Sequence, residues 1–153
     1  MKSALASLGS KRPAVLAADA ETAYPFREGT FDAVLADVPC SGIGTLRRNP
    51  EIKWRFQPER FPSMQRRQLA ILKSVAGSVR TGGILLYSTC STEPEENEDV
   101  VEAFLASTPG FRPCRPDHPP GIERWLDSEG FLKTFPSERG WDGFFSALML
   151  RFS

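Results

Sequence analysis

Short apolar runs that end in an acidic residue or a cysteine constrain the fold of this chain more than any other feature. These runs are AVLAAD at 14–19, FDAVLAD at 31–37 and ILLYSTC at 84–90. Short continuous apolar runs of this kind are typical of buried parallel strands. A helical pattern occupies 62–80, and FFSALMLRF at 144–152 predicts a final strand. The alternation of strands and helices predicts a doubly wound α/β sheet.

Local signals predict where the helices begin and end. Pro62 suits the first turn of the 62–80 helix, and Thr81-Gly82-Gly83 is expected to end it. Thr92-Glu93-Pro94-Glu95 resembles a capping box, which predicts a second helix with its apolar side at Val100, Val101, Phe104 and Leu105. Dense proline and glycine at 108–121 predict a long loop.

Composition excludes several classes of protein. The chain has 153 residues, which is enough for one domain. Its net charge is zero, so it is not a wholly basic nucleic-acid-binding domain. No apolar run approaches the roughly 20 residues of a membrane helix, and we expect no membrane association. Three cysteines are too few for a disulfide scaffold and fit a cytoplasmic protein.

Chemically active residues cluster at the expected carboxyl ends of the strands. Asp19, Asp37 and Cys90 end three of the runs, and Cys40 follows in the turn DVPCSG. Ligands of open α/β sheets bind at this edge, so these residues predict a site. The alternative is that the acids cap following elements and the cysteines are small buried hydrophobic residues.

The two thiols leave several chemistries open. Cys90 precedes a predicted helix start, whose dipole favours a nucleophilic thiolate, and Asp37 can exchange a proton nearby. A zinc site would use Cys40, Cys90, Cys114 and His118, but no CxxC pair is present. A thiol–disulfide switch between Cys40 and Cys90 and a hydrolase using His118 are weaker alternatives.

Charge is concentrated in one basic block. Residues 46–80 carry nine Lys or Arg and two Glu, whereas 91–102 carry six acids and no base. A basic block in a neutral protein is either a phosphate-facing surface or a solvated face.

Three segments resemble RNA cytosine-C5 methyltransferases, most closely the bacterial small-subunit (16S) rRNA type. They are ADVPCSGIGTLRRNPEIKW, GGILLYSTCSTEPEENEDVV and GWDGFFSALMLR. The paired PCSG and STCS motifs are the specific part of this resemblance, which spans about residues 12–152.

The resemblance implies roles for individual residues. Cys90 would be the nucleophile that adds to cytosine carbon 6, and Cys40 would assist breakdown of the covalent adduct. Asp37 would lie between the cytosine ring and the methyl end of the cofactor, S-adenosyl-L-methionine, and Asp19 would contact its adenosine part. The RNA-binding surface, with 16S rRNA as the expected partner, would include Arg47, Arg48, Lys53 and Trp54. Trp54 is alternatively a core aromatic residue.

The chain departs from the family at its start. The family's Gly-rich cofactor loop and N-terminal RNA-binding domain have no counterpart here, since Gly9 and Gly29 lie outside any Gly-rich run. We therefore expect 1–153 to be the C-terminal portion of a catalytic domain, a partial Rossmann-like S-adenosylmethionine-dependent fold. Its mostly parallel sheet would lack the first two strands of the family order 3-2-1-4-5-7-6. The exposed edges predict self-association or a missing N-terminal half.

Two other functions remain open from the sequence. One is a catalytically inert RNA-binding remnant that keeps the basic block without the cofactor. The other is an enzyme similar to DNA cytosine-C5 methyltransferases, in which Cys40 of the Pro-Cys motif would be the nucleophile.

Overall fold

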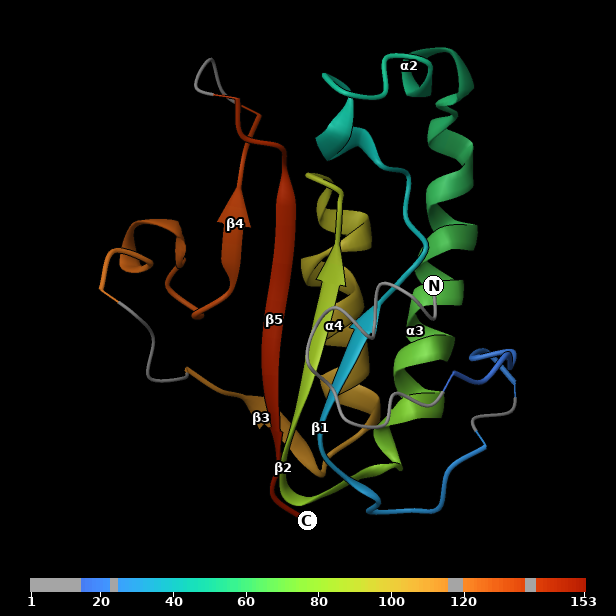
Figure 1. Cartoon of the computed structure of the whole chain (residues 1–153), viewed down its shortest axis with the longest axis vertical. Coiled ribbons are helices and arrows are strands. Elements are labelled where there is room, and N and C mark those ends of the chain that lie inside the picture. The colour runs from blue at the N-terminus through green and yellow to red at the C-terminus, as the bar shows by residue number, and fades with distance from the viewer. Residues whose placement is uncertain (1–14, 23–24, 116–119, 137–139) are drawn as a thin grey trace.

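The computed structural model describes residues 15–22, 25–115, 120–136 and 140–153. Its strands are β1 (Phe31–Asp37), β2 (Val79–Thr89), β3 (Phe111–Pro113), β4 (Leu132–Thr134) and β5 (Phe144–Arg151). They form a sheet in the order β1-β2-β5-β3, and β4 also pairs with β5 (Figure 1). β1 and β2 are parallel, whereas β5 is antiparallel to β2, β3 and β4. This mixed sheet matches the 4-5-7-6 half of the expected order, and the partial α/β fold is confirmed.

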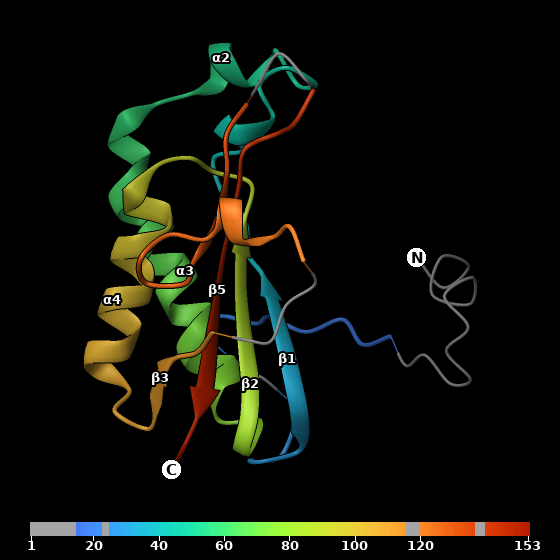
Figure 2. The same ribbon diagram turned by 90° about the vertical axis from the view of Figure 1, so that its left-hand side faces the viewer.

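Two longer helices pack on one face of the sheet. They are α3 (Phe61–Ala76) and α4 (Glu98–Ser107), and Figure 2 shows both on the same side. Shorter helices are α2 (Ile52–Arg55), η1 (Ile43–Thr45), η2 (Pro58–Arg60), η3 (Pro94–Glu96) and η4 (Glu123–Trp125). The core lies between the helices and the sheet, where Leu72, Phe104, Leu85, Tyr87 and Phe145 are at most 1% exposed. No helix among the described residues is long and apolar enough to cross a membrane.

The first helix ends earlier than its pattern predicts. α3 stops at Ala76, and β2 begins at Val79 instead of at residue 84. The backbone N–H groups of Gly29 and Phe31 donate to the carbonyls of Gly77 and Ser78 over 2.9 and 2.8 Å. Residues 77 and 78 form a turn that these two bonds tie to Gly29 and to the first residue of β1, so pairing with β1 overrides the helical periodicity.

The predicted capping box at 92–95 is wrong. The Glu93 N–H donates to Ser91 Oγ over 3.1 Å, and the Thr92 hydroxyl bonds to the Glu93 carboxylate instead of capping the helix. The helix is interrupted at Asn97, which separates η3 from α4. Asn97 is held there because its side chain accepts from Thr89 Oγ1 and donates to the Ser91 carbonyl. The apolar side is as expected, since Val100, Val101 and Phe104 are fully buried.

Two expectations about the N-terminal part are wrong for the described residues. Residues 15–19 of the predicted 14–19 strand form no strand, because no neighbouring strand pairs with them there. The doubly wound arrangement is also absent from this part, since α3 and α4 lie on one face. β1 therefore alternates, with Val34 and Ala36 buried and Leu35 63% exposed.

The expected 108–121 loop contains β3, because Phe111 packs edge-on against Phe104 in the core.

Candidate active site

Two thiols meet where the parallel strands end. The register pairs Asp37 of β1 with Ser88 of β2, so the residues that follow each strand are neighbours. Val38 N–H donates to the Ser88 carbonyl over 3.2 Å and extends this pairing toward Pro39. As a result, Cys40 Sγ and Cys90 Sγ lie 2.8 Å apart, and both cysteines are free and half-buried. The structure therefore brings together the two cysteines that the sequence placed at adjacent strand ends.

The contact between the thiols divides their acidities. The hydrogen bond from Cys40 is the main cause that lowers the pKa of Cys90, to about 7, although burial opposes it. The same hydrogen bond, together with burial, raises the pKa of Cys40. Near neutral pH Cys90 is therefore partly ionised, and the protonated Cys40 donates to its thiolate. A partly exposed thiolate of this kind is a nucleophile.

A buried carboxylate holds the loop that carries Cys40. Glu96 is fully buried and accepts from the Ser41 backbone N–H over 2.8 Å and from the Ser41 hydroxyl over 2.5 Å. Gln68 of α3 donates to Glu96 over 3.1 Å and to the Pro39 carbonyl over 3.0 Å. Both neighbours of Cys40 in the chain are therefore fixed by Glu96 and Gln68.

A second set of backbone contacts joins this loop to β2 and β5. Gly44 N–H donates to the Cys90 carbonyl over 3.0 Å, and Gly143 N–H donates to the Gly44 carbonyl over 2.7 Å. A Cβ atom at Gly44 would lie 2.0 Å from the Gly143 carbonyl oxygen, so only glycine fits. The PCSG, STCS and DGFF segments, far apart in the sequence, thus meet at one end of the sheet.

The two predicted cofactor residues lie in more open surroundings. Asp37 is exposed at the end of β1, and its charge raises the pKa of Cys90, so it acts electrostatically on the thiol pair. Asp19 lies outside any strand, and its carboxylate accepts from Glu21 N–H and Thr22 Oγ1 over 2.9 and 3.1 Å. Its carboxylate oxygens are therefore occupied within its own turn.

The predicted RNA-binding residues lie on the surface beyond Cys40. Trp54 is 85% exposed, which excludes the alternative that it is a core aromatic residue. Lys53 Nζ lies 6.0 Å from the Trp54 ring centroid. Arg47 is exposed, and Arg48 forms an ion pair with Asp142 over 2.9 Å.

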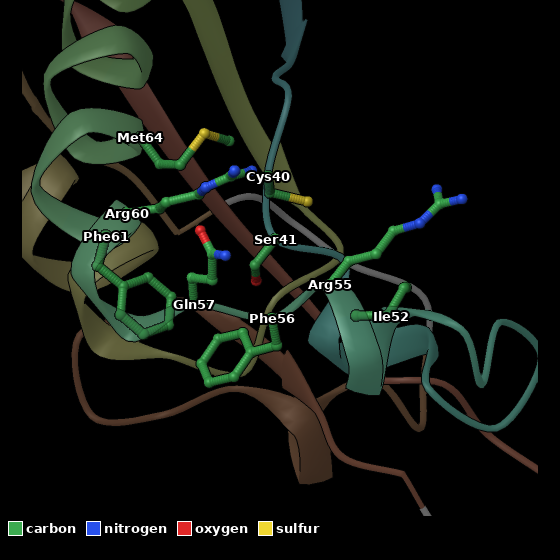
Figure 3. Close-up of a pocket in the computed structure, with 9 residues that line it drawn as sticks. All are labelled: Cys40, Ser41, Ile52, Arg55, Phe56, Gln57, Arg60, Phe61 and Met64. Atoms are coloured by element: carbon green, nitrogen blue, oxygen red, sulfur yellow. The ribbon is translucent and has the colours of Figure 1, made fainter.

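A cavity of about 300 Å³ adjoins Cys40. Cys40 and Ser41 lie on one wall, and the other walls come from α2, η2 and the first turn of α3 (Figure 3). Arg55, Phe56 and Arg60 supply two positive charges and an aromatic ring to this cavity. This arrangement suits an anionic ligand with a flat ring system.

Sequence reasoning did not single out Glu96, Gln68 or, apart from Cys40, the lining of this cavity. Glu96 is one of six acids in 91–102, and nothing in that run distinguishes it from its exposed neighbours. Gln68 did carry a signal, because it precedes Leu72 by four residues and so shares the apolar face of its helix. A polar residue on that face needs a buried partner.

The other predicted ligands do not join the thiol pair. The described residues contain no group of three His, Cys, Asp or Glu that could hold a metal ion. Cys114 follows β3, and its N–H donates to the carbonyl of Leu148 in β5. Cys90 instead follows Thr89, which pairs with Phe145 of β5. The two cysteines therefore lie beside different positions of β5. His118 lies outside the described residues.

Comparisons with known proteins converge on one family. The family model described as 16S rRNA methyltransferase RsmB/F matches residues 1–150. A probable ribosomal RNA small subunit methyltransferase B of Synechocystis sp. is 42% identical over 118 residues, covering 76% of this chain and 26% of that protein. The ribosomal RNA small subunit methyltransferase B of Thermus thermophilus is 40% identical over 124 residues, covering 77% of this chain and 29% of that protein.

Solved structures share the fold. The crystal structure of PH0851 is 37% identical with a TM-score of 0.69, covering 81% of this chain and 27% of that chain. NSun6 from Pyrococcus horikoshii is 24% identical with a TM-score of 0.77, covering 100% of this chain and 38% of that chain. The chain thus spans less than a third of the length of the curated relatives described above.

Proposed function

Because this chain belongs to the RsmB/F family of 16S rRNA methyltransferases, we propose that its thiol pair methylates cytosine C5 in RNA, with 16S rRNA as the substrate. The observation that carries this proposal is the 2.8 Å contact between Cys40 Sγ and Cys90 Sγ, whose hydrogen bond lowers the pKa of Cys90 to about 7. An inert remnant that only binds RNA would have no use for such a pair.

Each thiol has a separate task in the proposed reaction. Carbon 5 of cytosine is a poor nucleophile, so the Cys90 thiolate first adds to carbon 6, which breaks the C5–C6 double bond and leaves carbon 5 electron-rich. S-adenosyl-L-methionine, when bound, supplies the methyl group that carbon 5 takes. A base then removes the carbon 5 proton, the double bond re-forms, and Cys90 leaves as a thiolate. Cys40 keeps Cys90 ionised before addition and assists this final elimination.

The described residues fit the cofactor only in part. Asp37 is an exposed carboxylate beside the thiol pair, and we propose that it lies between the cofactor's methyl end and the cytosine ring. Asp19 would have to exchange its bonds to Glu21 and Thr22 for the cofactor's adenosine part. The relatives' greater length supports the proposal that 1–153 is the C-terminal portion of a catalytic domain, whose other half completes the pocket.

The RNA contacts are proposed from charge and exposure. The cavity beside Cys40 offers Phe56 for stacking on a base and Arg55 and Arg60 for phosphates. Arg47, Arg48, Lys53 and Trp54 extend this surface outside the cavity. An rRNA substrate also implies a cytoplasmic location for the proposed activity.

Covalent trapping on RNA that contains 5-fluorocytosine tests the proposal. After methyl transfer, carbon 5 carries fluorine in place of the proton that the base would remove, so Cys90 cannot be eliminated and the adduct persists. A chimaera that joins the upstream part of the Thermus thermophilus relative to this chain provides the whole site. We expect Cys90→Ser to abolish the adduct, and Cys40→Ala to form it and resolve natural cytosine slowly. Cys114→Ser is the matched control and should behave as the parent. Trapping that needs Cys40 but not Cys90 would favour the chemistry of DNA cytosine-C5 methyltransferases.

A further inference from the structure

A second cavity, of about 360 Å³, lies at the start of β5, where β4 and the residues just before β5 line it. Thr134 and Phe144 are paired across β4 and β5, and both line it. It is joined to the thiol pair through the backbone, since Gly143 bonds to Gly44 and Gly44 bonds to the Cys90 carbonyl. The end of β2, the start of β5 and the loop after β1 lie together at the top of Figure 1.

Exposed aromatic rings gather at this cavity. Trp141 is 50% exposed and Phe144 is 42% exposed, and both line it. Trp125 supports Trp141, with ring centroids 5.4 Å apart, and the Arg124 guanidinium lies 4.0 Å from the Trp125 centroid. Solvent-facing rings beside cationic side chains are the common way in which proteins hold single-stranded nucleic acid.

Arginines from the PCSG segment border the same cavity. Arg48 lines it and forms the ion pair with Asp142. The Arg47 guanidinium reaches Gly140, where a Cβ atom would lie 3.1 Å from its nitrogens. The cavity therefore carries positive charge at its rim.

Asp142 supplies an independent sign of a ligand. Its side chain is only 7% exposed, and Arg48 occupies Oδ2. The other oxygen, Oδ1, is buried and accepts no hydrogen bond from the residues that the structure describes. A buried carboxylate oxygen without a donor is costly, and a ligand N–H group would satisfy it.

We propose that this cavity binds a nucleobase with an exocyclic amino group, such as cytosine, from single-stranded RNA next to the target nucleotide. The base stacks on Trp141 and Phe144, its exocyclic amino group donates to Asp142, and Arg47 faces the phosphates. Carboxylates accept from the cytosine amino group in the same way in other nucleic-acid interfaces. The inference rests on the proposed function for the identity of the RNA as substrate.

Binding of labelled oligo(C) and oligo(U) to the full 153-residue chain, followed by fluorescence anisotropy, tests this subsite. We expect oligo(C) to bind more tightly than oligo(U). Trp141→Ala should weaken oligo(C) binding about tenfold, as expected for the loss of one stacked base, whereas Trp141→Phe should retain most of it. Asp142→Asn should remove the preference for oligo(C) over oligo(U).

Phe152→Ala is the matched control. Phe152 is also 50% exposed beside a cation, Arg112, but it follows the far end of β5. Equal binding of oligo(C) by Trp141→Ala and Phe152→Ala would overturn the inference. If Asp142→Asn fails to fold, the contrast between Trp141→Ala and Trp141→Phe decides. Since no covalent step is measured, a Trp141-dependent interaction without any Cys90 adduct would contradict the proposed function alone.

Discussion

The thiol side and the cofactor side of the candidate site are supported in different ways. On the thiol side, the loop that carries Cys40 is held by two buried residues. Gln68 lies in α3, and Glu96 lies in η3, just before α4. On the cofactor side, Asp37 lies at the open edge of β1, and Leu35 beside it is 63% exposed. Asp19 is bonded only within its own turn among the contacts described above.

The described residues can therefore prepare the nucleophile by themselves. The acidity of Cys90 is set by a hydrogen bond inside the chain, so the nucleophile is ready without the cofactor. On the cofactor side, β1 carries Asp37 at the edge of the sheet, and no described strand pairs with β1 on that edge. Thiol chemistry should therefore survive in the isolated chain while cofactor affinity should not.

Glu96→Ala should have the largest effect on the thiol side. It leaves the Ser41 N–H, the Ser41 hydroxyl and the Gln68 amide without their acceptor. An unsatisfied buried group costs about 1–3 kcal/mol, so we expect a loss of about 3 kcal/mol or more in the free energy of unfolding, measured by urea denaturation. Glu95→Ala, at an exposed neighbour, is the control and should change stability by less than about 0.5 kcal/mol. Equal losses in both variants would remove Glu96 as the support of the Cys40 loop.

Cofactor binding should separate the two sides next most clearly. Isothermal titration of the isolated chain with S-adenosyl-L-methionine should show no micromolar binding, because Asp37 and Asp19 are the only described residues proposed to contact the cofactor. The chimaera with the upstream part of the Thermus thermophilus relative is the positive control. Micromolar binding by a monodisperse monomer of the isolated chain would mean that its own residues build a cofactor pocket.

Neutralising Arg47, Arg48 and Lys53 should have the smallest effect. For each of these side chains that binds a phosphate of single-stranded RNA, its removal should lower the slope of log affinity against log salt by about 0.7. Lys73→Gln, on α3, is a single-charge control from the same basic block. A slope that stays the same in the triple variant would show that these residues form only a solvated face.

Sequence reasoning succeeded where neighbouring strands or motifs decided the geometry. The predicted strand ends correctly place Cys40 beside Cys90, because the parallel register of β1 and β2 fixes which residues are neighbours where the strands end. It failed where a partner outside the local pattern was needed. Residues 15–19 are apolar enough for a strand, yet they have no strand beside them in the described part of the chain.

The capping box and Glu96 show the same limit on a smaller scale. Thr92 and Glu95 have the spacing of a cap, but Asn97 is drawn to Thr89 and Ser91, and this tertiary contact interrupts the helix. Glu96 looks like a solvated acid until the fold places Ser41 and Gln68 against it. Both outcomes depend on residues beyond the turn of helix concerned, six and eight positions away for Asn97 and 28 and 55 positions away for Glu96, which local propensity does not register.

The pH dependence of Cys90 alkylation shows whether Cys40 lowers the pKa of Cys90. Iodoacetamide reacts with the thiolate, and peptide mass spectrometry of the isolated chain separates Cys90 from Cys114. Because the pKa of Cys90 is lowered to about 7, its alkylation should be fast above that pH and slow as the pH falls through it. Cys40→Ala removes the hydrogen bond that lowers the pKa, so the midpoint should move upward to about 9.0, the ordinary value for a cysteine, or beyond, since burial still opposes ionisation. A midpoint that is the same in both proteins would mean that Cys90 does not owe its reactivity to Cys40.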